Sequence, residues 1–249
     1  MFFRLITFMN TTRNYLDEDY SPDAVLVLGA SSAHHLVRVL RKKEGDEIEV
    51  FDGKGTSCLA KIHSIKPSEV TILVVGKIAF SARQGISINL GQALIKPDPF
   101  NLSIQKATEL GVDFITPLIT ERSTAKLNKE SYDKKRQKWQ VIAQGACEQC
   151  GQNWLPKINN PVALRDWSDE LQPDHKIVLY PGAEVKISDI EFKNSVTLAI
   201  GPEGDFSPSE IESLINEDYI PVSMGSRILR AETAVISALS TIRTLAGEF

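Results

Sequence analysis

A short apolar run that ends in a glycine-bearing loop decides the fold of this chain: Val196-Thr197-Leu198-Ala199-Ile200-Gly201-Pro202-Glu203-Gly204-Asp205-Phe206-Ser207. A continuous apolar run of this length is typical of a strand that is covered on both faces, as in a parallel sheet. After the loop, Ser207-Pro208-Ser209-Glu210 forms a capping box, in which Ser207 accepts from the Glu210 amide and Glu210 reaches back. The stretch therefore predicts a strand, a loop and a helix in succession.

Apolar runs and helical segments alternate in the same way from Ile86 to the C-terminus, which is typical of βα units on a parallel sheet. We expect the strands at 88–95, 114–119, 176–180, 196–200 and 220–224. Asp98 and Pro99 are predicted to start one helix as N-cap and first residue, and Gly111 to end it. The last segment carries an apolar stripe at helical spacing, which fits either core packing or a dimer interface. The stripe consists of Ala234, Val235, Ala238, Leu239, Ile242 and Leu245.

The chain before Phe80 follows a different pattern, in which short β-type runs alternate with turns. We expect strands at 24–28, 47–51 and 70–75, a helical segment at 34–41 and a first strand within residues 1–9. The pattern changes between Phe80 and Gly85. We therefore divide the chain into a small, mostly β domain at 1–80 and an α/β domain at 81–249.

The composition is that of an ordinary globular protein, with 249 residues, a net charge of −4 and a pI near 5.7. This acidic balance argues against non-specific coating of nucleic acid and limits any RNA contact to a local patch. No stretch reaches the roughly 20 apolar residues of a membrane span, so we expect a soluble, cytoplasmic protein.

The cysteines are Cys58, Cys147 and Cys150, too few for a disulfide framework and odd in number, which fits a reducing compartment. Cys147 and Cys150 have the spacing of half a zinc site, but a second ligand pair at metal-site spacing is missing. We predict no metal.

Two glycine-bearing loops follow two of the predicted strands, at 200–207 and at 224–234. In open α/β sheets, ligands bind beyond the carboxyl ends of the strands, where glycine lets the backbone approach them closely. A third strand exit, Leu179-Tyr180-Pro181-Gly182, adds an apolar wall, and the three together suit an adenine held by backbone groups. Neither loop matches a Walker or dinucleotide motif, and each glycine alone also fits an ordinary turn.

At this point the sequence resembles the RsmE-type ribosomal RNA uridine-N3 methyltransferases, a family within the SPOUT superfamily. The resemblance spans nearly the whole chain. Its motifs are the residues at 34–41 (HHLVRVLR), 105–112 (QKATELGV), 121–123 (ERS) and 146–150 (ACEQC), together with the two loops at 200–207 and 224–234.

The resemblance implies an α/β fold of SPOUT type, with a parallel sheet and a C-terminal trefoil knot, preceded by a PUA-like β-barrel domain that binds RNA. It implies an S-adenosylmethionine-dependent enzyme that acts as a homodimer on N3 of a uridine in 16S ribosomal RNA, within the small ribosomal subunit. Two positions depart from the family's usual pattern, since Asp205 stands in place of a second glycine and Ala231 in place of threonine. Neither change removes a backbone amide, but Asp205 adds a charge beside the pocket.

Methyl transfer is an in-line displacement, so catalysis is mainly orientation of the two reactants. Uridine N3 must also lose its proton, and a guanidinium would stabilise the charge that spreads onto the flanking carbonyl oxygens. We assign this role to Arg230, with pinning of the loop or pairing with Glu232 as the alternative. Glu203 could accept the proton or order its own loop.

The cofactor contacts that we expect are Leu179, Ile200, Gly201, Gly204, Met224, Gly225, Ile228, Leu229 and Ala234. The RNA contacts that we expect are Arg4, Arg38, Arg41, Lys96 and Arg122, because Arg and Lys hold phosphates; each alone also fits an ordinary surface charge.

Two other functions stay open. Many knotted relatives methylate the ribose 2′-oxygen, and a protein that kept the fold without the cofactor would only bind RNA. The intact Ile228-Leu229-Arg230 segment argues against the second of these.

Overall fold

The computed structural model describes residues 11–66, 69–123, 129–167 and 172–249. The predicted strand within residues 1–9 and the predicted RNA contact at Arg4 lie outside these residues. Within them, no helix is both long enough and apolar enough to cross a membrane.

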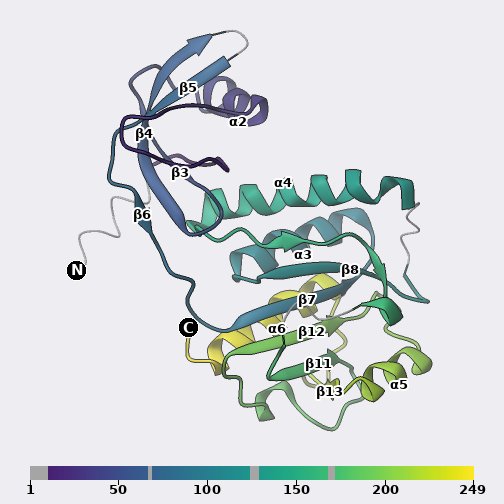
Figure 1. The fold of residues 1–249 in the computed structure, drawn as a ribbon. Coiled ribbons are helices and arrows are strands. Elements are labelled where there is room, and N and C mark those ends of the chain that lie inside the picture. The colour runs from purple at the N-terminus through teal and green to yellow at the C-terminus, as the bar shows by residue number, and fades with distance from the viewer. Residues whose placement is uncertain (1–10, 67–68, 124–128, 168–171) are drawn as a thin grey trace. The chain divides into compact units, whose positions relative to one another are not determined.

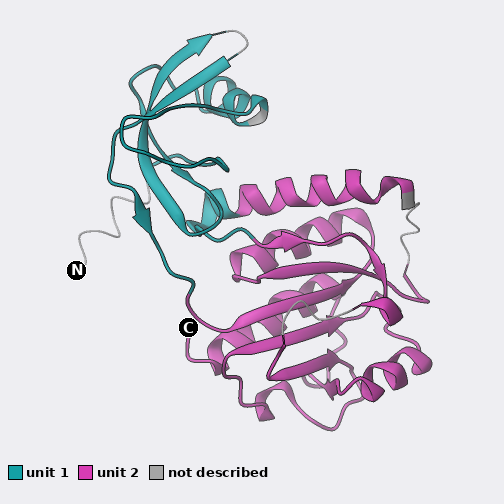
Figure 2. Ribbon diagram, viewed as in Figure 1, with its two compact units in different colours: residues 1–83, 147–155 teal, residues 84–146, 156–249 magenta. Residues whose placement is uncertain are grey.

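The chain forms two compact units (Figure 2). Unit 1 comprises residues 1–83 and 147–155, and unit 2 comprises residues 84–146 and 156–249. The sequence division assigns 147–155 to the α/β domain, whereas in the structure this segment clusters with unit 1.

Unit 1 is built on a sheet of six described strands in the order β1-β3-β4-β5-β2, with β6 beside β4 (Figure 1). All neighbours are antiparallel except β1 and β3. Leu36, Ile48, Ile62 and Ile72 are fully buried in its core. The strands are β1 (Arg13–Tyr15), β2 (Val25–Val27), β3 (Glu47–Phe51), β4 (Thr56–Lys66), β5 (Glu69–Val74) and β6 (Ala79–Phe80). The mostly β character of this part is confirmed, and β1, β4 and β6 are additions to the predicted strands.

The helical segment predicted at 34–41 divides into α2 (Ala30–His34) and a π-turn at His35–Val39. Leu36 turns into the core, while Arg38 and Arg41 are exposed. Arg41 has a φ of 54°, so the helical turn ends in the left-handed region at this residue.

The segment 147–155 is tied to the strands of unit 1 by buried polar contacts. The backbone amide of Tyr15 donates to Glu148 Oε1 at 3.0 Å. Arg13 forms an ion pair with Glu49 at 2.9 Å and donates to Asn153 Oδ1 at 2.6 Å. Since the Arg13 and Glu49 side chains are 7% and 8% exposed, loss of one partner would leave a buried charge, a change that typically costs several kcal/mol.

Unit 2 contains a sheet of seven described strands, all parallel, in the order β10-β8-β7-β12-β11-β13, with β9 beside β8. The strands are β7 (Ser87–Ala93), β8 (Phe114–Ile119), β9 (Lys157–Ile158), β10 (Val162–Ala163), β11 (His175–Leu179), β12 (Ser195–Ile200) and β13 (Ile220–Val222). The α/β class and the parallel sheet are confirmed, and the five predicted strands correspond to β7, β8, β11, β12 and β13.

Four longer helices follow these strands: α3 (Pro97–Glu109), α4 (Tyr132–Cys150), α5 (Pro208–Asn216) and α6 (Ala231–Leu245). Short 3-10 turns lie at Lys129–Ser131, Leu164–Asp166 and Ile187–Asp189. The capping box at Ser207 is confirmed, because Ser207 Oγ accepts from the Glu210 amide at 3.2 Å and Glu210 Oε2 accepts from the Ser207 amide at 2.8 Å. The predicted start of α3 at Asp98 is wrong, because Lys96 is the N-cap and Pro97 the first residue. Pro97 and Pro99 both suit a first turn, so the pattern did not distinguish between them.

The two faces of the sheet are covered by different helices. Val178 and Ala199 pack with Ile211 and Leu214 of α5 on one face. Because side chains alternate along a strand, Leu179 and Ile200 point to the other face, where α6 packs against β12 and α3. The apolar stripe of α6 mostly serves the core, since Val235, Ala238, Leu239 and Ile242 are buried, whereas Leu245 is 42% exposed.

The C-terminal end of α6 is held by a buried arginine. Arg243 donates to the carbonyl oxygens of Leu110 and Ile86, each at 3.0 Å, and pairs with Glu248 at 2.6 Å. Glu248 also accepts from the Ile86 amide at 2.6 Å. These bonds fix α6 along the sheet and so fix the position of its N-terminal end.

We predict that Gly91→Ala lowers the free energy of unfolding by about 1–3 kcal/mol, because its Cβ would overlap the buried indole ring of Trp167. The matched control is Gly145→Ala in α4, where a Cβ meets nothing within 4 Å; this change should stabilise the helix by up to about 1 kcal/mol. Urea unfolding of both variants measures the difference, and equal effects would contradict the close packing at Gly91.

Candidate functional site

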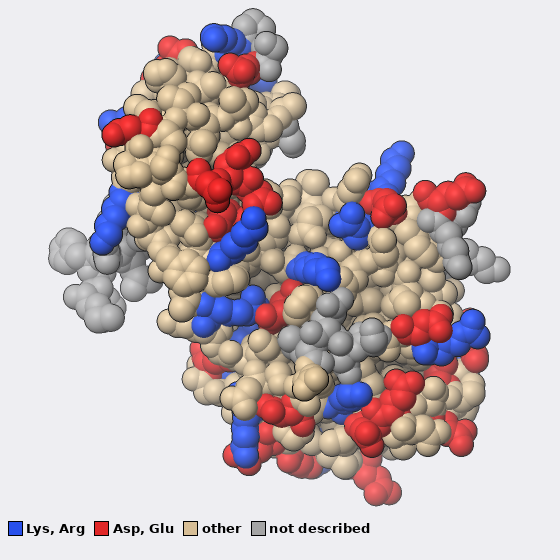
Figure 3. Space-filling view, viewed as in Figure 1, with Lys and Arg blue, Asp and Glu red and all other residues tan. Residues whose placement is uncertain are grey.

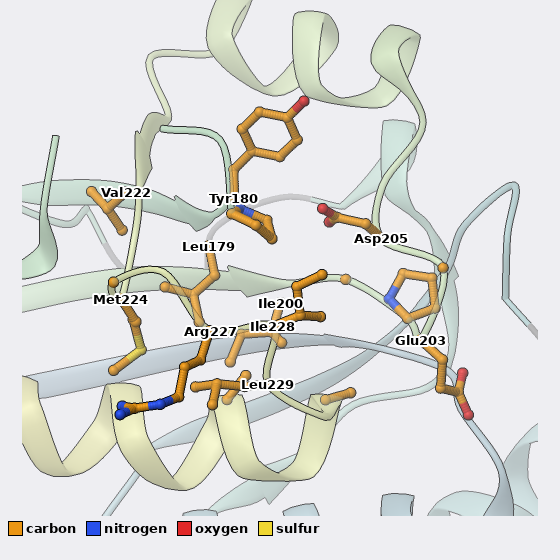
Figure 4. A pocket seen from close by; sticks show the side chains of 17 residues that line it. Leu179, Tyr180, Ile200, Glu203, Asp205, Val222, Met224, Arg227, Ile228 and Leu229 are labelled. Atoms are coloured by element: carbon orange, nitrogen blue, oxygen red, sulfur yellow. The ribbon is translucent and has the colours of Figure 1, made fainter. Parts of the chain in front are cut away.

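A cavity of about 290 Å³ lies where the chain leaves β11, β12 and β13 (Figure 4). These three strands are neighbours and parallel, so their carboxyl ends meet at one edge of the sheet. The walls are the exits of β11 and β12, the loop after β13 and the first turns of α6.

All nine residues that the sequence predicted as cofactor contacts line this cavity: Leu179, Ile200, Gly201, Gly204, Met224, Gly225, Ile228, Leu229 and Ala234. The lining also includes residues that the sequence did not predict as cofactor contacts, namely Tyr180, Pro181, Pro202, Glu203, Asp205, Val222, Arg227 and Ala231. Most of these adjoin predicted contacts along the chain, so extension from each strand end by two or three residues would have found them.

The lining is chiefly apolar and leaves apolar surface uncovered. Ile228 is 87% exposed although it lines the cavity. Leu179 and Ile200 lie opposite Ile228 and Leu229 in Figure 4. Two apolar walls with strand-end backbone between them fit a flat ring such as adenine, whose faces are apolar and whose edge forms hydrogen bonds.

The loop at Gly201 is tightly packed. A Cβ on Gly201 would lie 3.0 Å from Asp205 Oδ1 and 3.1 Å from the Phe206 amide nitrogen. Asp205 itself has a φ of 60°, in the left-handed region that favours glycine. Its Oδ1 accepts from the Phe206 amide at 2.8 Å, the kind of local bond that lets Asp adopt this conformation. Burial raises the pKa of the Asp205 carboxyl above its ordinary value.

Arg122 holds the same loop from outside the cavity. Its Nη1 donates to the carbonyl oxygens of Gly204 at 2.8 Å and Phe206 at 3.4 Å. The guanidinium also lowers the pKa of Asp205, although the effect of burial is larger. The predicted RNA contact at Arg122 is thus a side chain that already has partners within unit 2.

The two predicted catalytic residues lie at the rim. Arg230 is the exposed N-cap of α6, between Leu229 and Ala231 of the cavity wall, and its side chain makes no hydrogen bond or ion pair among the described residues. Glu203 lines the cavity, but its carboxylate points away from the other labelled side chains in Figure 4.

The remaining predicted RNA contacts are exposed in both units. Arg38 and Arg41 lie in unit 1, and Lys96 lies at the N-terminal end of α3 in unit 2. On the face shown in Figure 3, Lys and Arg side chains lie among Asp and Glu side chains over unit 2.

Cys147 and Cys150 occupy the C-terminal end of α4. Cys147 is buried and its Sγ lies 3.6 Å from the carbonyl oxygen of Trp154, whereas Cys150 is exposed. Burial raises the pKa of the Cys147 thiol to about 12. Over the described part of the chain, no group of three His, Cys, Asp or Glu side chains is placed to hold a metal ion.

Comparison with known proteins supplies a family. Residues 82–243 match the model of an RNA methyltransferase domain and residues 28–75 that of an RNA methyltransferase PUA domain. The chain is 35% identical over 238 residues to the ribosomal RNA small subunit methyltransferase E of Buchnera aphidicola subsp. Schizaphis graminum, covering 95% of this chain and 97% of that protein. The chain belongs to the ribosomal RNA small subunit methyltransferase E family.

Solved structures of similar proteins agree with this family. The enzyme of that name from Neisseria gonorrhoeae, bound to S-adenosyl methionine, has a TM-score of 0.85 and 28% identity, over 95% of this chain and 98% of that one. A Legionella pneumophila protein solved with bound SAM has a TM-score of 0.89 and 36% identity, over 94% and 98% of the two chains.

We predict that Asp205→Asn stabilises this family member at pH 7. The folded-state pKa of Asp205 lies above its unfolded value, so ionisation disfavours the folded state as the pH rises through that range. Asparagine keeps the Oδ1 acceptor, tolerates the left-handed backbone and carries no charge. The free energy of unfolding should rise by at most about 1 kcal/mol, because the site is partly solvated, and the gain should shrink as the pH falls towards about 4.

Urea unfolding between pH 7 and pH 4 measures this effect. The matched control is Asp174→Asn, because hydrogen bonds from the backbone amides of Asn194 and Ser195 lower the pKa of Asp174. That change should lower the free energy of unfolding at pH 7, and its effect should approach zero as the pH falls. A loss of stability for Asp205→Asn at pH 7 would contradict the unfavourable burial of its charge.

Proposed function

We propose that this protein transfers a methyl group from S-adenosylmethionine to N3 of a uridine in 16S ribosomal RNA. The observation that carries the proposal is the cavity at the ends of β11, β12 and β13, which the two glycine-bearing loops line together. The relatives named for methylation of small-subunit ribosomal RNA and the two neighbours solved with SAM support both the reaction and the cofactor.

The cavity residues have the chemistry that this cofactor needs. When bound, S-adenosylmethionine supplies an activated methyl group on a positively charged sulfur. Leu179, Ile200, Ile228 and Leu229 would enclose the adenine ring, and the backbone of the 201–206 and 224–229 loops would form hydrogen bonds with its edge. These two loops are among the segments in which the sequence resembles the family, which favours the same role for them in this chain and in its relatives.

At the rim, Arg230 would act on the uridine. A bond forms between N3 and the methyl carbon, the carbon–sulfur bond breaks, and the N3 proton leaves to solvent or a base. The unpartnered guanidinium of Arg230 suits the carbonyl oxygens that share the negative charge of deprotonated N3. Glu203, whose carboxylate turns away from the cavity in Figure 4, suits ordering of its loop better than proton transfer.

We further propose that residues 1–80 form a PUA-like RNA-binding domain and that residues 81–249 form a SPOUT domain with a trefoil knot. The PUA match at 28–75 supports the first assignment. The second is supported by the chain path, since the chain leaves β13 at the sheet edge and returns to α6 against β12 in the middle of the sheet.

The same resemblance carries the proposals of a cytoplasmic homodimer that acts on the small ribosomal subunit. The exposed apolar side chain of Ile228 at the cavity rim is consistent with cover by a second copy. Arg4, Arg38, Arg41, Lys96 and Arg122 remain the proposed RNA contacts, of which Arg38, Arg41 and Lys96 are exposed without an ion pair among the described residues.

Nucleoside analysis tests the reaction. Small-subunit ribosomal RNA, free or assembled, is incubated with the purified protein and S-adenosylmethionine and then digested to nucleosides for mass spectrometry. We expect 3-methyluridine as the product. A 2′-O-methyl nucleoside would instead establish the ribose methyltransferase, and cofactor binding without any methylated product would contradict the proposal.

We predict that Arg230→Ala lowers kcat by roughly 100-fold, as for removal of one donor to a developing oxyanion, while the cofactor dissociation constant changes less than about twofold. Single-turnover kinetics and calorimetry measure the two quantities. The control is Arg165→Ala in unit 2, whose side chain is 84% exposed and away from the cavity lining. Equal losses of turnover and cofactor affinity would show that Arg230 only supports the loop.

A further inference from the structure

Three charged residues line the cavity, and only one of them directs its charge inward. Glu203 and Arg227 are exposed, and in Figure 4 their charged groups point away from the centre. Asp205 is partly buried, and in Figure 4 its carboxylate points towards Tyr180, which also lines the cavity. The cavity therefore contains one inward carboxylate among mostly apolar walls.

The position of this carboxylate is fixed on both sides. Oδ1 accepts from the Phe206 amide at 2.8 Å, which holds the side chain against its own loop. Arg122 binds the carbonyl oxygens of Gly204 and Phe206, which holds the loop itself. Asp205 Oδ2 makes no hydrogen bond among the described residues, so one oxygen remains available to the cavity.

The carboxylate also lacks a counter-charge inside the cavity. Arg122 is the cation that acts on it, and the guanidinium of Arg122 is engaged with loop carbonyls. Burial is the larger influence and raises the pKa of Asp205. A cation bound in the cavity would offset this cost of desolvation.

We propose that Asp205 makes the cavity selective for the positively charged methyl donor over its neutral product, S-adenosylhomocysteine. The inference rests on the proposed function. The sulfonium is bonded directly to the 5′ carbon of the ribose, so a cavity that encloses the adenosyl group also encloses that charge. Methyl transfer converts the sulfonium into a thioether, whereas the ribose, the adenine and the amino-acid group are the same before and after.

The consequence is a difference in affinity between two ligands of nearly equal size. The attraction to Asp205 is present for the donor and absent for the product, so the product dissociates more readily than the donor. Asp205 occupies a left-handed position, which glycine adopts most readily, and this selectivity gives its side chain a function at that position.

Calorimetry with S-adenosylmethionine and S-adenosylhomocysteine tests the proposal on the full chain and on Asp205→Asn and Asp205→Gly. Asparagine keeps the shape and the Oδ1 acceptor, and glycine removes the side chain without backbone strain. Both variants should lose affinity for S-adenosylmethionine by about tenfold, the order of a charge–charge interaction in partly solvated surroundings. Their affinity for S-adenosylhomocysteine should stay within about twofold.

A salt series gives an independent readout. The affinity of the unsubstituted protein for S-adenosylmethionine should fall with ionic strength more steeply than that of Asp205→Asn. Equal loss of both ligands would show that Asp205 binds a group common to them, such as a ribose hydroxyl, and unchanged affinities would show that it faces only solvent; either result overturns the proposal. If the unsubstituted protein binds neither ligand, the proposed function fails instead.

Discussion

Strands β11, β12 and β13 lie side by side and run parallel, so the chain leaves all three at one edge of the sheet. The walls at the strand exits depend on this constraint, and the first turns of α6 supply the remaining wall. Alternation along the strands adds a second condition: Leu179 and Ile200 face α6, while Val178 and Ala199 enter the opposite core. The buried hydrogen bonds of Arg243 hold α6 in place at its C-terminal end, and the N-terminal turn of α6 thereby completes the cavity.

The cavity loop at 201–206 is held in place by several weak contacts rather than by one strong contact. A Cβ at Gly201 would press against Asp205 and Phe206, and Asp205 closes the turn by accepting a hydrogen bond from the Phe206 amide. Arg122 donates hydrogen bonds to two carbonyl groups of the turn, which would otherwise form hydrogen bonds with water. Each of these hydrogen bonds is worth about 1 kcal/mol, and a loop that they hold in place would lose less conformational entropy when a ligand binds.

The sequence predicted those features that depend on neighbouring residues. Apolar runs located the central strands, and the spacing of Ser207 and Glu210 located the start of α5. The nine expected cavity residues came together because strand ends in a parallel sheet share an edge. The association of 147–155 with unit 1 was missed, because it depends on partners such as Tyr15 that are far away in sequence. The charge of Asp205 was expected beside the pocket, but the direction of its carboxylate was not predicted, because it depends on a φ of 60° and on the bond from the Phe206 amide.

The charges at the two ends of the site act on different steps. Arg230 lies at the rim, where in the proposed reaction it would stabilise the deprotonated base, whose negative charge must exist before the methyl group can move. Asp205 lies inside and stabilises the sulfonium, whose positive charge is already diminished in the transition state. An interaction that is stronger in the ground state than in the transition state slows the chemical step. The carboxylate therefore benefits turnover only where exchange of the product for a new donor, rather than methyl transfer, sets the rate.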